Sequence, residues 1–129
     1  MARLLIIDDD VHICQFLQLL LQSEGHEVAI ANDGNEGIRL QGKKPFELII
    51  TDIFMPNKEG METISDLKRD YATIPIIAIS GTNMGGKESH LRFAQKLGAD
   101  MSISKPITKD ILISAVDALL GSNNKLVNE

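Results

Sequence analysis

Residues 4–10 read LLIIDDD, an unbroken apolar run that ends in three consecutive aspartates. Continuous apolar runs of this kind are typical of strands in parallel sheets, because helices cover both faces of such sheets. Two further runs, at 48–50 and 74–79, have the same character. The stretch therefore predicts a buried parallel strand with acidic side chains at its carboxyl end.

Strand-like and helical patterns alternate five times along the chain. The expected strands are Arg3–Ile7, Glu27–Ala31, Glu47–Thr51, Ile74–Ile79 and Met101–Ser104, and the expected helices are Val11–Ser23, Asn35–Gln41, Glu59–Asp70, Lys87–Leu97 and Lys109–Leu120. Gly25, Gly42 and Gly121 are expected to end the first, second and last helices. This alternation is typical of βαβ units, whose right-handed crossovers make all the strands parallel. We expect an α/β fold with a five-stranded parallel sheet and five helices distributed over both faces.

The composition is that of one small domain with its own core. The chain has 129 residues, of which 43% are hydrophobic, 24% charged and 4% aromatic. A chain of this length buries roughly two thirds of the surface that its unfolded form exposes, so it needs no disulfide or structural metal. The single cysteine, Cys14, is expected to be a buried, inert thiol. Residues 1–121 are expected to form the domain, and residues 122–129 a frayed polar tail.

The charge balance excludes some classes of partner. The chain has 13 basic and 18 acidic residues, a net charge of −5 and a pI near 5.1. A broad nucleic-acid-binding face needs clustered lysines and arginines, so we expect no direct contact with nucleic acid. The longest apolar run, Leu4–Ile7, is too short to span a bilayer, and no secretory leader precedes it. The sequence therefore predicts a cytoplasmic protein that does not contact a membrane.

Four of the expected strands end in polar side chains. Asp8 and Asp9 follow the first strand, and Asp52, Ser80 and Lys105 follow the third, fourth and fifth. Because the carboxyl ends of parallel strands lie along one edge of the sheet, these side chains are expected to converge. Carboxylates about 5 Å apart repel each other by roughly 3 kcal/mol per pair at an effective dielectric constant near 20, so a cation must balance them.

The predicted cation is Mg²⁺. It binds one or two carboxylates and keeps its other positions for water or phosphate oxygens. Such a site is suited to a phosphoryl group: Lys105 and the metal neutralise its oxygens, Ser80 donates a hydrogen bond, and Asp52 is placed to attack. Asp10 is interpreted as the N-cap of the following helix, because aspartates after strands commonly cap helices.

At this point the sequence resembles the response-regulator receiver domains of two-component signalling, the CheY-like family. The resemblance covers residues 1 to about 121 and rests on four motifs in order. They are LLIIDDD at 4–10, LIITDIFMPNKEG at 48–60, IIAISGT at 76–82 and SKP at 104–106. It implies a flavodoxin-like, doubly wound sheet with strand order 2-1-3-4-5.

The resemblance also implies roles for individual residues. Asp52 would be phosphorylated from a phosphohistidine on a sensor histidine kinase or a histidine phosphotransferase. Asp9, Asp52 and the backbone carbonyl of Phe54 would bind Mg²⁺ (or Mn²⁺), with Asp8 assisting through water. Ser80 and Lys105 would hold the phosphoryl oxygens, and the peptide bond between Lys105 and Pro106 is expected to be cis. Phe54 and Thr82 are expected to flank the pocket and control the access of water.

Several positions depart from the commonest family pattern. Glu59 stands where aspartate is usual, and Ser80 replaces the more frequent threonine. Ser102 occupies the position of an aromatic residue that often swings inward on activation, so the switch must work without it. The connection at Thr82–Gly86 is longer than usual, which makes the neighbouring partner surface unusual.

Three functions remain open on the sequence alone. The first is a phospho-accepting switch that catalyses only its own phosphorylation and dephosphorylation, and is therefore not a metabolic enzyme. The second is a phosphohydrolase of the haloacid-dehalogenase kind, although its Asp-x-Asp signature is missing because Phe54 stands two residues after Asp52. The third is an interaction module that works without phosphorylation. The output is equally open: the domain acts on a downstream protein by itself, or it serves an output domain of a longer protein.

Overall fold

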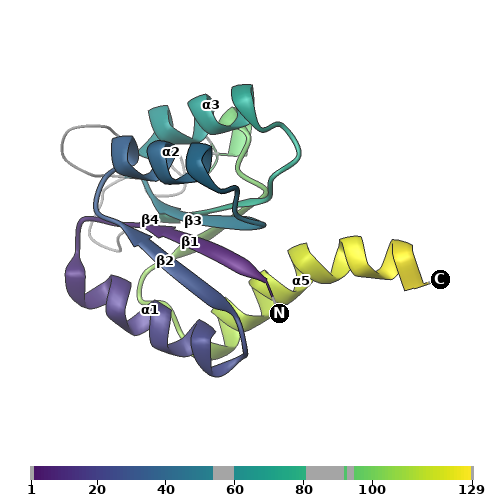
Figure 1. The fold of residues 1–129 in the computed structure, drawn as a ribbon. Coiled ribbons are helices and arrows are strands. Elements are labelled where there is room, and N and C mark those ends of the chain that lie inside the picture. The colour runs from purple at the N-terminus through teal and green to yellow at the C-terminus, as the bar shows by residue number, and fades with distance from the viewer. Residues whose placement is uncertain (1, 54–59, 81–91, 93–94, 129) are drawn as a thin grey trace.

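The computed structural model describes residues 2–53, 60–80, 92 and 95–128, with only the backbone described beyond residue 121. Its sheet has five parallel strands in the order β2-β1-β3-β4-β5. The strands are β1 (Arg3–Ile7), β2 (Glu27–Ala31), β3 (Leu48–Asp52), β4 (Ile76–Ser80) and β5 (Met101–Ser104). The helices are α1 (Val11–Ser23), α2 (Gly34–Lys43), α3 (Gly60–Asp70) and α5 (Lys109–Asn128). Helices α1 and α5 cover one face of the sheet, and α2 and α3 cover the other (Figure 1). This is the expected α/β architecture and strand order.

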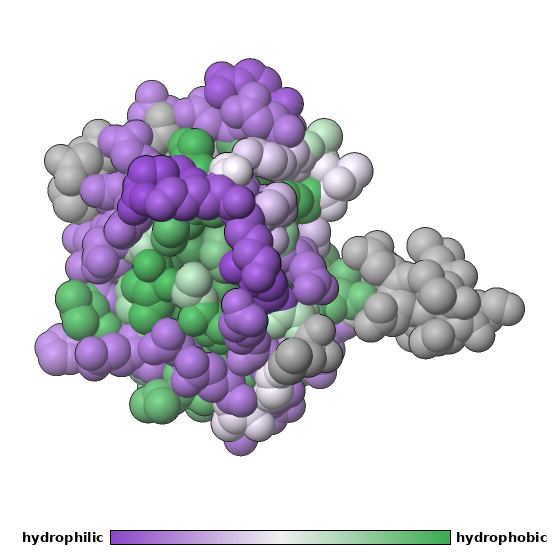
Figure 2. Space-filling view, in the orientation of Figure 1, coloured by the Kyte–Doolittle hydropathy of each residue, from purple (hydrophilic) through white to green (hydrophobic). Residues whose placement is uncertain are grey.

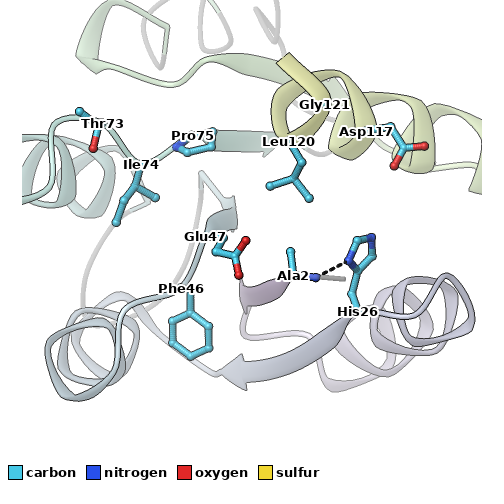
Figure 3. Close-up of a pocket in the computed structure, with 10 residues that line it drawn as sticks. All are labelled: Ala2, His26, Phe46, Glu47, Thr73, Ile74, Pro75, Asp117, Leu120 and Gly121. Atoms are coloured by element: carbon cyan, nitrogen blue, oxygen red, sulfur yellow. Dashed lines mark hydrogen bonds between the residues drawn. The ribbon is translucent and has the colours of Figure 1, made fainter. Parts of the chain in front are cut away.

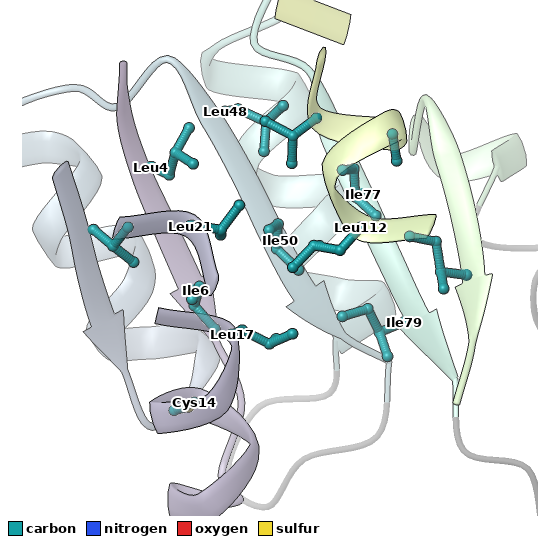
Figure 4. Close-up of a cluster of buried hydrophobic side chains, with 14 of the residues drawn as sticks. Leu4, Ile6, Cys14, Leu17, Leu21, Leu48, Ile50, Ile77, Ile79 and Leu112 are labelled. Carbon is teal, nitrogen blue, oxygen red and sulfur yellow. The ribbon is translucent and has the colours of Figure 1, made fainter. Parts of the chain in front are cut away.

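Each face of the sheet has its own hydrophobic core. On the face of α1 and α5, Leu4 and Ile6 of β1 pack with Leu17, Leu21 and Leu112 (Figure 4). On the opposite face, the alternate residues of β1 pack against α2 and α3. These residues and their main partners are Leu5, Ile7, Ile49, Ile64 and Leu67. The unbroken apolar run of β1 is therefore explained, because successive side chains of a strand point to opposite faces and both faces are buried.

The surface shows the same layering from outside. Figure 2 shows hydrophobic residues gathered in a recess over the edge strand β2, between hydrophilic surfaces on the sides of α2 and α1. Val28 in this strand is 8% exposed, and Ile30 is partly buried against the core. In the part of the chain that the structure describes, no helix has the length and apolar character needed to cross a bilayer.

The expected bounds of four elements are confirmed. The bounds of β1, β2, β5 and α1 agree with the prediction, and Gly25 follows α1 with a φ of 91°. Such a left-handed conformation is the one that favours glycine after a helix. β3 lies one residue later than expected, so that it includes Asp52, and β4 begins after Pro75 rather than before it. Proline has no N–H to donate to a neighbouring strand.

Two helices differ from the expectation. α2 begins at Gly34, because Asp33 caps it by accepting the Glu36 N–H at 2.8 Å, and it continues through Gly42 to Lys43. α5 likewise continues through Gly121 to Asn128 instead of ending at Leu120. Gly121 has no positive φ, so it lacks the conformation in which a glycine ends a helix. The backbone of residues 122–128, expected as a polar tail, therefore continues the helix.

The fourth expected helix, Lys87–Leu97, falls mostly outside the described residues. Those of its residues that the structure describes, Arg92 and 95–97, are helical.

Candidate functional site

Four neighbouring strands bring charged and polar side chains to one edge of the sheet. Asp8 directly follows β1, Asp52 ends β3, Ser80 ends β4 and Lys105 follows β5. Carboxylate oxygens of Asp8, Asp9 and Asp52 all lie within 4.8 Å of one another. The Lys105 Nζ lies 3.5 Å from Asp52 Oδ2 and 3.6 Å from Asp8 Oδ2. The structure therefore brings Asp8, Asp9 and Asp52 together as a compact acidic group with the Lys105 ammonium beside it.

The electrostatic balance of this group is unfavourable without a further cation. Asp8 is 1% exposed, and burial raises the pKa of its carboxyl to about 6. The negative charges of Asp52 and Asp9 raise this pKa further, whereas the Asp10 N–H and the Lys105 ammonium lower it. One ammonium group therefore faces three carboxylates. The buried carboxylate, that of Asp8, takes up a proton at a higher pH than an ordinary aspartate does.

The geometry of the acidic group fits a divalent cation. Asp8 Oδ1 accepts the Asp10 N–H at 2.9 Å, but Asp8 Oδ2 has no hydrogen bond among the described residues. A buried carboxylate oxygen without a hydrogen bond is costly, and a water molecule bound to a metal ion would satisfy it. Mg²⁺ prefers carboxylate and water oxygens as ligands, and Asp9 and Asp52 supply the carboxylates next to Asp8.

Asp10 caps α1, as predicted. Its Oδ1 accepts the N–H groups of His12 at 2.9 Å and Ile13 at 3.2 Å, the usual geometry of an N-cap aspartate. The Asp10 carboxylate is therefore engaged in capping α1, whereas its neighbour Asp9 is the predicted metal ligand.

Cys14 contacts the backbone of the turn that carries Asp8, Asp9 and Asp10. Its Sγ donates to the Asp8 carbonyl oxygen at 3.2 Å, and the side chain is buried. Burial, together with the charges of Asp8, Asp10 and Asp9, raises the pKa of the thiol to about 11. The predicted burial of the thiol is confirmed, but its contact with the turn was missed. The position of Cys14 one helical turn after the N-cap Asp10 is the signal that indicates this contact.

The Ser80 and Lys105 end of the site is aligned by strand pairing. Ser80 is opposite Ser104 in the β4–β5 register, and the Lys105 N–H donates to the Ser80 carbonyl oxygen at 2.8 Å. Ser80 is fully buried, and the peptide bond between Lys105 and Pro106 is cis, as expected.

Gly60 is a site-supporting residue that the sequence analysis missed. Its N–H donates to the Ile53 carbonyl oxygen at 2.7 Å, so α3 begins directly against the end of β3. A Cβ at this position would lie 1.9 Å from the Asp52 carbonyl oxygen and 2.5 Å from Ile53 Cα. No side chain fits there unless the backbone that carries Asp52 moves. Nothing in the local sequence indicates this contact, because it depends on where the start of α3 packs against the end of β3.

Some of the predicted residues cannot be placed. Phe54, Thr82 and Glu59 lie outside the described residues, as does the connection Thr82–Gly86. Ser102 is described: it lies in β5 opposite Ala78 and lines a groove between this strand and α5.

Comparisons with known proteins agree with this geometry. The family model of the response regulator receiver domain matches residues 4–117. The chain is 35% identical over 119 residues to the CAI-1 autoinducer sensor kinase/phosphatase CqsS of Vibrio cholerae, which covers 90% of this chain and 17% of that protein. It is also 35% identical over 118 residues to the cell cycle response regulator CtrA of Brucella ovis, which covers 92% of this chain and 50% of that one.

Solved structures extend the similarity to the fold. A response regulator receiver domain protein from Clostridium thermocellum matches with a TM-score of 0.88 and 29% identity, over 98% of this chain and 99% of that one. A CheY-like receiver domain protein from Methanospirillum hungatei matches with a TM-score of 0.88 and 30% identity, over 97% and 98% of the two chains. The chain spans half or less of the two curated relatives, so the similarity concerns this domain and not their whole length. Since the family model covers most of its residues and the solved receivers share its fold, the chain belongs to the response regulator receiver domain family of two-component systems.

Proposed function

We propose that this domain is a phosphorylation switch in which Asp52 accepts a phosphoryl group. The observation that carries the proposal is the convergence of Asp8, Asp9 and Asp52 within 4.8 Å, with the Lys105 ammonium 3.5 Å from Asp52 Oδ2. A phosphoryl group brings negative charge to a region that already has an excess of it. Only an arrangement that also holds cations can stabilise that charge, and this group supplies one cation and the ligands for another.

Mg²⁺ or Mn²⁺ is the proposed cofactor. Asp9 and Asp52 would bind it directly, together with the backbone carbonyl of Phe54, and Asp8 would contact it through water. When bound, the ion would neutralise the oxygens of the incoming phosphoryl group. The Asp8 Oδ2 atom, which has no hydrogen bond among the described residues, supports this assignment.

The chain's own residues would carry out the transfer. A carboxylate oxygen of Asp52 attacks phosphorus, a P–O bond forms, the P–N bond to the donor histidine breaks, and the imidazole leaves with the electron pair of that bond. Lys105 would pair with one phosphoryl oxygen, and Ser80 would donate a hydrogen bond to another. Attack of water on the same phosphorus would release phosphate and return Asp52 to its carboxylate. The domain would therefore catalyse only its own phosphorylation and a slow autodephosphorylation.

The proposed donor is a sensor histidine kinase or a histidine phosphotransferase. It must approach the edge where Asp52 lies, and exposed apolar side chains border this edge: Val11 is 52% exposed and Phe16 47% exposed. A hollow of about 240 Å³ lies between α1 and the residues after β5, lined by Phe16, Lys105 and Pro106 among others. The similar protein that is named a sensor kinase/phosphatase supports a donor of this class.

Phosphorylation would shift an equilibrium between two conformations and change which protein binds. We propose residues 1–121 as the unit that switches, in the cytoplasm, and residues 122–129 as a segment that leads away from it. The target would be a downstream protein or an output domain. Because Ser102 has no aromatic ring, the switch would move β5 and α5 without an aromatic rotamer change. The net charge of −5 supports a protein target in preference to direct contact with nucleic acid.

Beryllofluoride, a mimic of the phosphoryl group, tests the proposal. We expect that it will shift the amide NMR signals of Asp8, Ser80 and Lys105 in the wild-type protein only when Mg²⁺ is present. Asp52→Asn is expected to abolish these shifts without changing the rest of the spectrum. An unchanged wild-type spectrum would contradict the proposal.

Two other outcomes would identify the alternative functions. Multiple-turnover hydrolysis of small phosphoesters would indicate a phosphohydrolase of the haloacid-dehalogenase kind. Binding of a partner that is unaffected by Asp52→Asn and by beryllofluoride would indicate a module that works without phosphorylation.

A further inference from the structure

We propose that a hollow at the amino edge of the sheet receives a lysine or arginine side chain of a partner protein. The hollow measures about 630 Å³ and lies at the end of the strands opposite to Asp8 and Asp52 (Figure 3). Ala2, His26, Glu47 and Pro75 each directly precede a strand, and all four line it. It is therefore a separate feature from the acidic site, on the other edge of the same sheet.

The walls of the hollow come from two layers of the fold. Leu120 and Asp117 belong to α5, whereas Ile74 belongs to the connection between α3 and β4. Figure 3 shows the Leu120 side chain extending from α5 toward the side of the hollow on which Glu47 lies. A ligand between them would contact apolar surface and carboxylate oxygens at the same time.

Among the described residues, the charged side chains that line the hollow have one sign. Glu47 and Asp117 contribute carboxylates, and no lysine or arginine is among the described residues that line it. Asp117 has no hydrogen bond or ion pair within the described part of the chain, and the one contact of the Glu47 carboxylate is the Arg3 N–H, 3.3 Å from Oε1. His26 Nδ1 accepts the Ala2 N–H at 3.2 Å, so this ring nitrogen is already engaged within the fold.

These features together select a cation on an aliphatic stem. Lysine and arginine side chains pack their methylene groups on apolar surface while the charged end reaches polar groups. Leu120 and Ile74 provide the apolar surface, and Glu47 and Asp117 provide the acceptors. Both carboxylates would repel an anionic ligand, and a neutral apolar one would leave Asp117 without a partner and Glu47 with only the Arg3 N–H.

The exposure of the two carboxylates favours a protein segment over a free cation. Glu47 and Asp117 are both exposed, and exposed ion pairs contribute little to binding because water screens them. A free amine would gain only those pairs. A protein segment adds apolar neighbours of the basic residue, which can cover Leu120 and Ile74 at the rim. The occupant we infer is therefore a short basic and apolar segment of another protein.

Short capped peptides test this proposal by NMR with the whole chain. The probe is acetyl-Leu-Arg-Leu-amide, and the matched control is the same peptide with citrulline, which keeps the shape of arginine without its charge. We expect saturable shifts of the amide signals of Glu47, Thr73 and Asp117 with the arginine peptide. The double substitution Glu47→Gln with Asp117→Asn is expected to weaken its binding roughly tenfold. Asp110→Asn, which changes an exposed acid of α5 outside the hollow, is expected to have no effect.

Each alternative result overturns a part of the claim. Equal binding of the citrulline peptide would show that the charge plays no part, and the absence of shifts at millimolar peptide would remove the site altogether. Binding of free arginine amide or putrescine as tight as that of the peptide would make it a site for small cations instead of a protein segment. Because the hollow lies away from Asp52, Asp52→Asn is expected to leave peptide binding unchanged, so this test is independent of the proposed phosphorylation.

Discussion

Asp8 carries a charge that the folded protein disfavours. Its carboxyl has a pKa of about 6 instead of 3.8, first because it is buried and then because Asp52 and Asp9 lie beside it. The folded state therefore holds this proton more tightly than the unfolded chain does. The free energy of unfolding therefore decreases as the pH rises from 3.8 to about 6, and Asp8 causes no further decrease above that range.

Asp8→Asn is expected to stabilise the metal-free protein. At about pH 7.5 the free energy of unfolding should increase by roughly 1–3 kcal/mol, because the amide has no charge to bury and its oxygen can still accept the Asp10 N–H. Urea unfolding in the presence of a chelator measures this gain. At about pH 4.5 the gain should shrink, because Asp8 of the folded wild type is then already protonated. A gain of the same size at both pH values, or a loss at either, would contradict the account.

The neighbours Asp9 and Asp10 are expected to behave differently despite their adjacent positions. Asp9→Asn should weaken Mg²⁺ binding about tenfold or more, because it removes the charge of a proposed ligand. Asp10→Ala should change Mg²⁺ affinity by less than about threefold and lower the free energy of unfolding by about 1 kcal/mol, because it removes a cap. Calorimetric titration and urea unfolding measure the two effects. Loss of Mg²⁺ binding in Asp10→Ala would make Asp10 a ligand instead of a cap.

At the scale of the elements, two glycines in helices have opposite roles. Gly60→Ala is expected to lower the free energy of unfolding by roughly 1–3 kcal/mol, because its Cβ would overlap the Asp52 carbonyl oxygen. Gly121→Ala has open space around it and is expected to raise the free energy of unfolding by roughly 0.5–1 kcal/mol, since alanine is the better helix former.

Urea unfolding of both variants distinguishes the two roles. In addition, Gly60→Ala should slow phosphorylation by acetyl phosphate at saturating Mg²⁺, because it displaces the backbone that carries Asp52. Gly121→Ala serves as the matched control and should leave that rate unchanged. Equal stability of the two variants would show that α3 does not press against the end of β3 in the way described.

Elements whose bounds depend on local sequence patterns were predicted correctly. β1 and α1 were placed correctly because an unbroken apolar run and a helical repeat are local patterns, and because Gly25 adopts the left-handed conformation that ends a helix. The end of α5 was misplaced because Gly121 carries no such conformation, and a glycine letter alone does not reveal its φ. Helix ends depend on backbone conformation, which the sequence constrains only weakly.

At the scale of the whole molecule, the site was predictable to the extent that topology determines it. Parallel strands bring their carboxyl ends to one edge, so Asp8, Asp52 and Lys105 could be placed together from the alternation of elements alone. The contacts of Cys14 and Gly60 with this edge could not be predicted in the same way, because they depend on how α1 and the start of α3 pack against the ends of the strands.

Removal of divalent cations is expected to act on the whole domain through this edge. Mg²⁺ would bind the folded state and not the unfolded chain, so it should raise the free energy of unfolding in proportion to the logarithm of its concentration above the dissociation constant. Thermal unfolding in Mg²⁺ and in chelator measures the effect. Asp52→Asn should show a smaller response, and an identical midpoint in both buffers for the wild type would contradict a metal site.

The most direct test of the central claim is to locate the phosphoryl group chemically. The protein is incubated with acetyl phosphate and Mg²⁺, and borohydride then reduces any aspartyl phosphate to homoserine, which peptide mass spectrometry can assign to a position. If Asp52 accepts the phosphoryl group, homoserine is expected at residue 52 in the wild type, and at no position when Mg²⁺ is withheld or when Asp52→Asn is used. Homoserine at another position, or the absence of any phosphorylation of the wild type in the presence of Mg²⁺, would contradict it.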